Sequence, residues 1–308
     1  MHELNWMHTA VVLIALSAIF YLVRLVAKPP ASGFAQKAGW GSLLLAFLCM
    51  IVSLVIRSQT AQYFALSNMY ESLLVVCLGI QLVFLVLDQW FSGKLAIRTL
   101  GLPVCLLLLA AVVFDLSLPT HIKPLQPALQ SYWRSIHVPI ILLSYALFTV
   151  AFLSSFVYLV KSALEKSNDP ATRNSGGGGQ RQAAVTPEGI TFDALALADD
   201  AERDKANVYD EITYRCVAFG FPMLLLGIIL GGIWANEAWG NYWSWDPKES
   251  MALVTLLAYG VYLHLRVKGG HSARMLAWVS VTGFLLMLVT YFGVNLMGIG
   301  LHSYGKIG

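Results

Sequence analysis

Residues 137–161 read HVPIILLSYALFTVAFLSSFVYLVK, and this stretch decides the fold class. It contains no acidic residue and no arginine, and its one lysine is the last residue. As an α-helix at about 1.5 Å per residue, it would extend for about 37 Å, whereas the hydrocarbon core of a bilayer is about 30 Å thick. The stretch therefore predicts a membrane-spanning helix.

The composition of the whole chain agrees with this prediction. Of its 308 residues, 57% are hydrophobic and only 12% are charged, and the mean hydropathy is +0.67. A soluble domain carries about 25% charged residues, so the excess apolar surface here must face lipid. A net charge of +3 gives no support to a nucleic-acid partner.

Seven further apolar runs have similar lengths. We therefore predict an all-α, polytopic integral membrane protein with about eight transmembrane helices. The spans lie near residues 8–27, 39–57, 69–91, 96–115, 137–161, 212–233, 248–266 and 274–298. Because the N-terminal run lacks a basic start and a small-residue cleavage site, we expect it to be a span and not a cleaved signal.

The basic residues indicate how the chain is oriented. With the N-terminus outside, 15 of the 20 lysines and arginines fall on the inner side, and the other five fall outside: Arg57, Lys123, Arg134, Lys248 and Lys306. The positive-inside rule favours this orientation. Both termini are then expected on the outer (lumenal or periplasmic) side.

One segment between the spans is polar. Residues 162–208 include four consecutive glycines at 176–179 and an acidic stretch at 193–204. We interpret this segment as a cytoplasmic linker with room for one short surface helix. It divides the chain into residues 1–161, with spans one to five and His137, and residues 209–308, with spans six to eight and His302.

Aromatic residues are concentrated between the sixth and seventh spans. Residues 231–250 read GGIWANEAWGNYWSWDPKES and contain four tryptophans: Trp234, Trp239, Trp243 and Trp245. They form either an aromatic belt at the membrane interface or a platform for a large flat ligand. Their concentration in one loop beside several glycines favours the platform.

The end of this loop has the pattern of a helix start. Asp246 can cap the helix, Pro247 suits its first position, and Glu249 stands where the acid of a capping box belongs. Capping is therefore the simpler role for Asp246, with a ligand-binding role as the alternative.

The same run resembles the tryptophan-rich WWD signature of haem-handling membrane proteins, and more narrowly the CcsA family of the type II cytochrome c biogenesis system. Supporting stretches are LSNMYESL (66–73), QSYWRSIHVP (130–139), YLHLR (262–266) and GVNLMGIGLHSYG (293–305). The sequence departs from the family at Ser250-Met251, where Thr-Trp is common. The resemblance implies that haem is handled at the outer face beside the tryptophan loop.

Two outer histidines are candidate ligands of the haem iron. His137 opens the fifth span and His302 follows the eighth, and a noncovalent haem takes axial imidazoles on both faces of its ring. The alternative is that both are ordinary polar residues at the interface. The resemblance favours the ligand role, because these positions match the external haem ligands of the family.

His264 is placed differently. It lies 18 residues beyond Asp246, about 27 Å along a helix, in the inner half of the membrane. It either binds a membrane-embedded haem, as the resemblance implies, or extends to the inner headgroups near Arg266. Since it is the only histidine well inside a span, a second ligand for such a haem should come from another chain.

The remaining polar candidates have plainer interpretations. His121 is a weaker alternative ligand, and His2, His8 and His271 are expected to be solvated. We expect Glu71 to pair with a basic residue or cap a helix, with a role in positioning the ligand as the alternative. Asp115 is expected to be solvated at the outer interface. The four cysteines form neither CxxC nor CxxCH and are expected to be packing residues.

The resemblance also implies a function. The chain would be the haem-binding membrane subunit of a cytochrome c synthetase (haem lyase) complex, which delivers noncovalent, transient haem b and presents it for thioether attachment to the CxxCH of apocytochrome c. Haem is then substrate as well as cofactor. A CcsB-like subunit is an implied partner and thiol-reducing proteins are further candidates, in a cyanobacterial or plastid thylakoid membrane or a bacterial inner membrane.

Two rival functions stay open from the sequence. A haem exporter or chaperone without ligation chemistry would use the same loop and histidines. A membrane electron-transfer subunit would need two histidine pairs within spans, which the sequence lacks. Whether this chain alone is an enzyme is also open.

Overall fold

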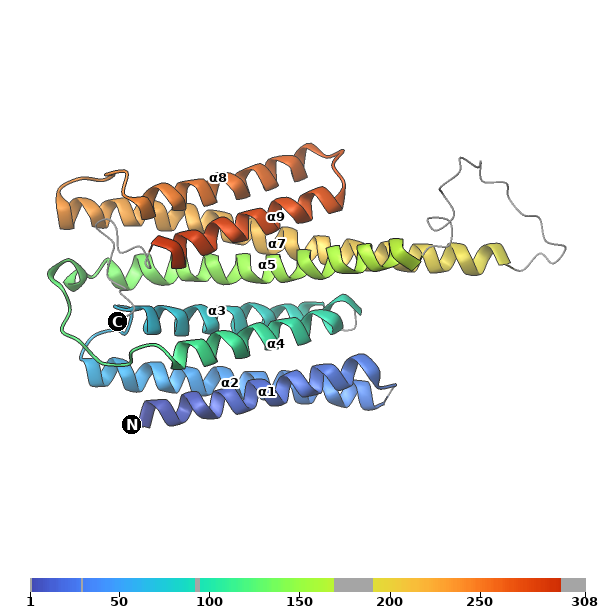
Figure 1. Ribbon diagram of the computed structural model, residues 1–308, viewed down its shortest axis with the longest axis horizontal. Helices are drawn as coiled ribbons and strands as arrows, with labels where there is room; N and C mark the ends of the chain where they lie inside the picture. Colours follow the sequence, from blue (N-terminus) through green and yellow to red (C-terminus); the bar gives the residue numbers. More distant parts are fainter. Residues whose placement is uncertain (1, 29, 92–94, 169–190, 295–308) are drawn as a thin grey trace.

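The computed structural model describes residues 2–28, 30–91, 95–168 and 191–294, and these are almost entirely helical (Figure 1). Eight helices are long and apolar enough to cross a membrane. They are α1 (His2–Val26), α2 (Ala31–Ala61), α3 (Met69–Trp90), α4 (Leu95–Leu116), α5 (Arg134–Asn168), α7 (Thr191–Trp239), α8 (Pro247–Lys268) and α9 (Ala273–Leu288). A 3-10 turn (Pro127–Gln130) and a π-helix (Val289–Gly293) complete the described elements. The all-α membrane fold is confirmed.

Each predicted span coincides with one of these helices, although residues 295–298 of the eighth lie outside the described residues. The sixth begins much earlier than expected. Helix α7 starts at Thr191, within the segment interpreted as a linker, and continues without a break to Trp239. Its part from Val208 onward is the membrane-spanning part. The helix in that segment is therefore not a separate surface helix but the first turns of α7.

The helices lie side by side and alternate in direction, because most connections between them are short (Figure 1). Helix α1 packs on α2 and α4, and α5 packs on α3, α7 and α9. The start of α1 and the connections at 62–68, 117–133 and 240–246 gather at one end, on the left in Figure 1. This end is the one predicted to lie outside, and its orientation across a membrane stays a prediction.

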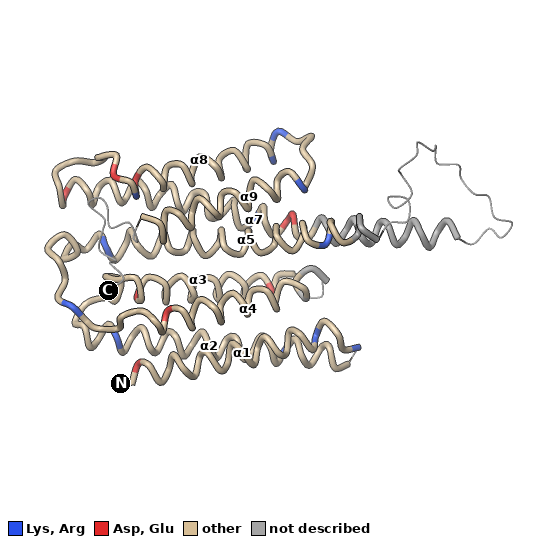
Figure 2. Tube along the Cα trace, viewed as in Figure 1, with Lys and Arg blue, Asp and Glu red and all other residues tan. Residues whose placement is uncertain are grey.

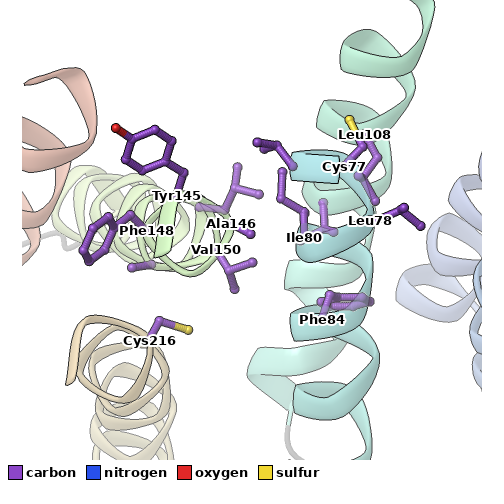
Figure 3. Packing of buried hydrophobic residues seen from close by; sticks show 14 of the residues in the cluster. Cys77, Leu78, Ile80, Phe84, Leu108, Tyr145, Ala146, Phe148, Val150 and Cys216 are labelled. Atoms are coloured by element: carbon purple, nitrogen blue, oxygen red, sulfur yellow. The ribbon is translucent and has the colours of Figure 1, made fainter. Parts of the chain in front are cut away.

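Apolar side chains hold α3, α4 and α5 together. In Figure 3, Ala146 and Val150 of α5 face Ile80 on α3, while Tyr145 and Phe148 leave α5 on the other side. The ring of Phe148 stacks on that of Tyr259 of α8 at 3.7 Å between centroids. All four cysteines are buried and free, as expected of packing residues.

Two buried ion pairs join the helices near opposite ends of α3. Arg24 Nη1 of α1 lies 3.2 Å from Asp88 Oδ1, and Arg57 Nε of α2 lies 2.8 Å from Glu71 Oε1. Elsewhere the charged residues lie mostly toward the helix ends (Figure 2). The prediction that Glu71 pairs with a basic residue is confirmed.

The prediction for Asp115 is wrong. Its carboxylate is completely buried, and neither oxygen has a hydrogen-bond partner in the described part of the chain. The residue lies in the last turn of α4, which packs against α3 and so does not face the headgroups. Reading only its distance along the span could not reveal that packing.

Candidate functional site

A cavity of about 170 Å³ opens between α3, α5, α7 and α8, at the end of the bundle where the tryptophan-rich connection lies. Its wall is mostly aliphatic and aromatic. The lining residues include Asn68, Met69, Ser72, His137, Tyr145, Gly231, Trp234, Trp243, Lys248, Glu249 and Tyr291. A mostly apolar cavity with a few polar groups is the usual form of a small-ligand site.

His137 is held in this wall by a backbone carbonyl of a neighbouring helix. Its Nδ1 lies 2.7 Å from the oxygen of Gly227 on α7. A carbonyl oxygen can only accept a hydrogen bond, so Nδ1 carries the proton, and in the neutral ring Nε2 is then the unprotonated nitrogen. The ring also lies edge-on to Trp234, with 5.7 Å between centroids.

The close approach of α7 to this imidazole requires a glycine at position 231. A β-carbon there would lie 2.6 Å from Cε1 of His137, a distance that real β-carbons do not reach. Helix α7 ends just beyond, where Gly240 has φ +77° and its N–H donates to the carbonyl of Asn236 at 2.9 Å. A residue with positive φ is the usual end of a helix.

The four tryptophans do not share one surface. Trp234 is 4% exposed and donates its indole N–H to the carbonyl of Ala128 at 3.1 Å. Trp234 and Trp243 line the cavity with His137, whereas Trp239 lines a separate hollow beside the 3-10 turn. Trp245 is 72% exposed, has φ +58° and meets Trp243 edge-on at 5.8 Å.

Asp246 has the capping role that its position indicated. Its side chain accepts from the N–H of Lys248 at 2.9 Å, and Glu249 Oε2 accepts from the N–H of Asp246 at 3.2 Å, which completes a capping box. The cap fixes the first turn of α8, and this turn brings Lys248 and Glu249 to the cavity wall.

The other histidines lie away from this cavity or outside the described residues. His264 is near the opposite end of α8, and its side chain is exposed on the surface of the bundle. His121 is exposed in the connection between α4 and α5, and His2 and His8 are exposed on α1. His302 lies outside the described residues.

Sequence reasoning missed several residues of the cavity wall. Tyr291 lies in the π-helix after α9, and its hydroxyl is 2.8 Å from Oγ of Ser72. Irregular turns of this kind occur often at functional sites, but the sequence does not mark them. Lys248 belongs to the tryptophan-rich motif, but its place in the mostly apolar wall of the cavity appears only in the structure.

Comparison with known proteins identifies the family. The model of the cytochrome c assembly protein family matches residues 66–302. The chain belongs to the cytochrome c assembly protein family. This membership gives it a role in cytochrome c biogenesis.

Relatives of this assembly protein match it over most of both chains. The cytochrome c biogenesis protein CcsA of Crocosphaera subtropica is 37% identical over 87% of both chains. CcsA of Nostoc punctiforme is 34% identical over 98% of this chain and 97% of its own, and CcsA of Chlorella vulgaris is 36% identical over 94% and 92%. With eight apolar helices and such relatives, this assembly protein is an integral protein of a thylakoid or bacterial inner membrane.

A solved structure shares the fold. The cytochrome c haem lyase CcmF superposes with a TM-score of 0.58 and 13% identity. The match covers 96% of this assembly-family chain and half of the CcmF chain. At this identity the likeness concerns the arrangement of the helices alone.

Proposed function

We propose that the chain is the haem-binding membrane subunit of a cytochrome c synthase, which brings haem b to the outer face and presents it to the CxxCH of apocytochrome c. The observation that carries the proposal is the bond from His137 Nδ1 to the carbonyl of Gly227. Histidines that bind a metal through one ring nitrogen usually donate the other ring N–H in this way. The cavity thus offers Nε2 as an iron ligand.

The cavity wall suits a large flat ligand. Trp234, Trp243, Tyr145 and Tyr291 supply aromatic surface around His137, and such rings pack well against a porphyrin. A second ligand is proposed at His302, from its position after the eighth span and from the resemblance to the family. Trp245 is exposed and its ring contacts that of Trp243. In this proposal it covers the solvent-facing side of the bound ligand.

The chemistry itself belongs to haem and apocytochrome c. A cysteine S–H adds across a vinyl C=C: sulfur bonds to one vinyl carbon, the hydrogen goes to the other, and no electrons are gained or lost overall. The role of this protein is to bind the macrocycle, hold its orientation and exclude water from most of its surface.

His264 supports a second proposal, which concerns a partner. Its side chain is exposed on α8 in the described part of the chain, so it is accessible to a group outside this bundle. We propose that it supplies one ligand of a membrane-embedded haem whose other ligand comes from a CcsB-like subunit. In that complex haem would pass from the inner half of the membrane to the cavity at His137.

The experiment that tests ligation uses the full chain with its partner subunit and a CxxCH reporter, in a host without its own synthase. Covalent haem on the reporter is measured by peroxidase stain. We expect His137→Ala to lower it at least about tenfold and the exposed control His8→Ala to leave it unchanged. Export of haem by the wild type without any covalent product would instead establish the exporter function.

A further inference from the structure

One cation lies in the wall of the cavity. Among its described lining residues, Lys248 is the only lysine or arginine, and its side chain is half-buried. In an apolar wall the local dielectric is lower than in water, so a cation attracts an entering anion more strongly there. The charge of Lys248 therefore favours entry of the anionic part of a ligand at this end of the cavity.

The backbone around Lys248 is fixed. Pro247 begins α8, and the Asp246 carboxylate accepts from the Lys248 N–H at 2.9 Å. Asp246 itself is 5% exposed. Because the capping box holds this first turn of the helix, the place of the Lys248 side chain in the wall is set by the fold.

Two acids flank Lys248 in the sequence, Asp246 and Glu249, and both take part in the cap of α8. Glu249 Oε2 accepts from the N–H of Ser244 at 2.8 Å, from its hydroxyl at 3.2 Å and from the N–H of Asp246. The carboxylate of Asp246 accepts from the N–H of Lys248. These N–H and O–H donors partly offset the negative charge of both carboxylates.

Two helix starts also meet at the cavity. Asn68 and Met69 line it from the start of α3, and Lys248 and Glu249 line it from the start of α8. The amino end of a helix carries partial positive charge, which favours a nearby anion. Because Asn68 already caps α3 and Asp246 and Glu249 already cap α8, the positive charge of Lys248 is the main attraction for an anion here.

We propose that Lys248 binds a propionate of haem and so determines which edge of the macrocycle lies against α3 and α8. The inference rests on the proposed function, since it takes haem as the ligand. Both propionates of haem b are on neighbouring pyrroles at one edge of the ring, so anchoring that edge turns the vinyl groups away from Lys248. The residue thereby positions the vinyl groups for the incoming thiols.

The test separates the carboxylates from the rest of the ligand. Purified full-length protein is titrated with haem and with haem dimethyl ester, in which both propionates are methylated. Wild type is compared with Lys248→Gln, with Lys248→Arg and with Lys268→Gln, a control that removes an exposed lysine at the far end of the same helix. Binding is followed in the Soret band.

Lys248→Gln should weaken haem about tenfold, as expected from one lost charge-assisted hydrogen bond, and leave the ester unchanged. Lys248→Arg and Lys268→Gln should keep the wild-type preference for haem. Binding of the ester also shows that a variant is folded. If Lys248→Gln does not fold, Lys248→Met replaces it.

Two results overturn the proposal. Equal weakening of haem and ester would mean that Lys248 acts through packing, and unchanged affinity for both would mean that it makes no contact with the carboxylates. In either case the proposed function stands if both ligands still depend on His137. A wild type that binds neither ligand through His137 would contradict the proposed function itself.

Discussion

At position 231 the absence of a side chain determines where the imidazole of His137 can lie. The β-carbon of any other residue would come within 2.6 Å of Cε1, so the ring would have to move, and its bond to the Gly227 carbonyl with it. The position of the His137 imidazole is therefore fixed by three residues on two helices.

We expect Gly231→Ala to displace His137 and weaken haem binding about tenfold or more, with a loss of about 1–3 kcal/mol in stability from the overpacked contact. Gly41→Ala on α2 is the matched control, because no atom lies within 4 Å of its added β-carbon. Haem titration and thermal unfolding in detergent measure the two effects. Equal haem affinity in both variants would show that the contact does not matter.

Substitution of Asp246 separates its two possible roles. As a cap, it can be replaced by serine, so Asp246→Ser should keep haem binding, whereas Asp246→Ala should lose about 1 kcal/mol of stability. The measurement is haem affinity beside thermal unfolding for both variants. A folded Asp246→Ser protein that no longer binds haem would mean that the carboxylate contacts the ligand directly.

At the scale of helices, α1 is joined to α3 by a charge pair with no exposure to solvent. The side chains of Arg24 and Asp88 are both 0% exposed. Removing one partner of such a pair leaves the other charge in an apolar interior, which is far more costly than losing a surface pair.

Asp88→Asn should therefore destabilise the protein by about 3–5 kcal/mol. The control is Glu211→Gln, which breaks the partly exposed pair with Arg215 four residues on and should cost less than about 1 kcal/mol. Unfolding of both variants in detergent is compared with wild type. Similar losses in the two would indicate that Arg24 finds equivalent stabilisation without Asp88.

The helices were predictable, and the direction of individual side chains was not. A long apolar run such as 137–161 can satisfy its backbone in lipid only as a helix, so composition alone places α5. Which tryptophans face the cavity depends on the irregular backbone between Gly240 and Asp246, where Trp245 adopts positive φ. The bond of His137 joins residues 90 positions apart, and the sequence carries no sign of such a pairing.

At the scale of the whole molecule, one end of the bundle carries the cavity and the connections at 62–68, 117–133 and 240–246 (Figure 1). The surplus of basic residues toward the other end predicts that the cavity end lies outside. Cysteines introduced at exposed Asn241 and Gln126 should then react with an impermeant maleimide from outside, and one at Lys268 should not. The reverse pattern would place the cavity on the inner side.

The proposed function requires that this cavity binds haem through His137. The most direct measurement is the absorption spectrum of the purified full-length protein, as wild type, as His137→Ala and as His121→Ala, an exposed histidine in a connection at the same end. We predict low-spin haem in the wild type and in His121→Ala, and its loss or conversion to high spin in His137→Ala. An unchanged low-spin spectrum in a folded His137→Ala protein would contradict the account.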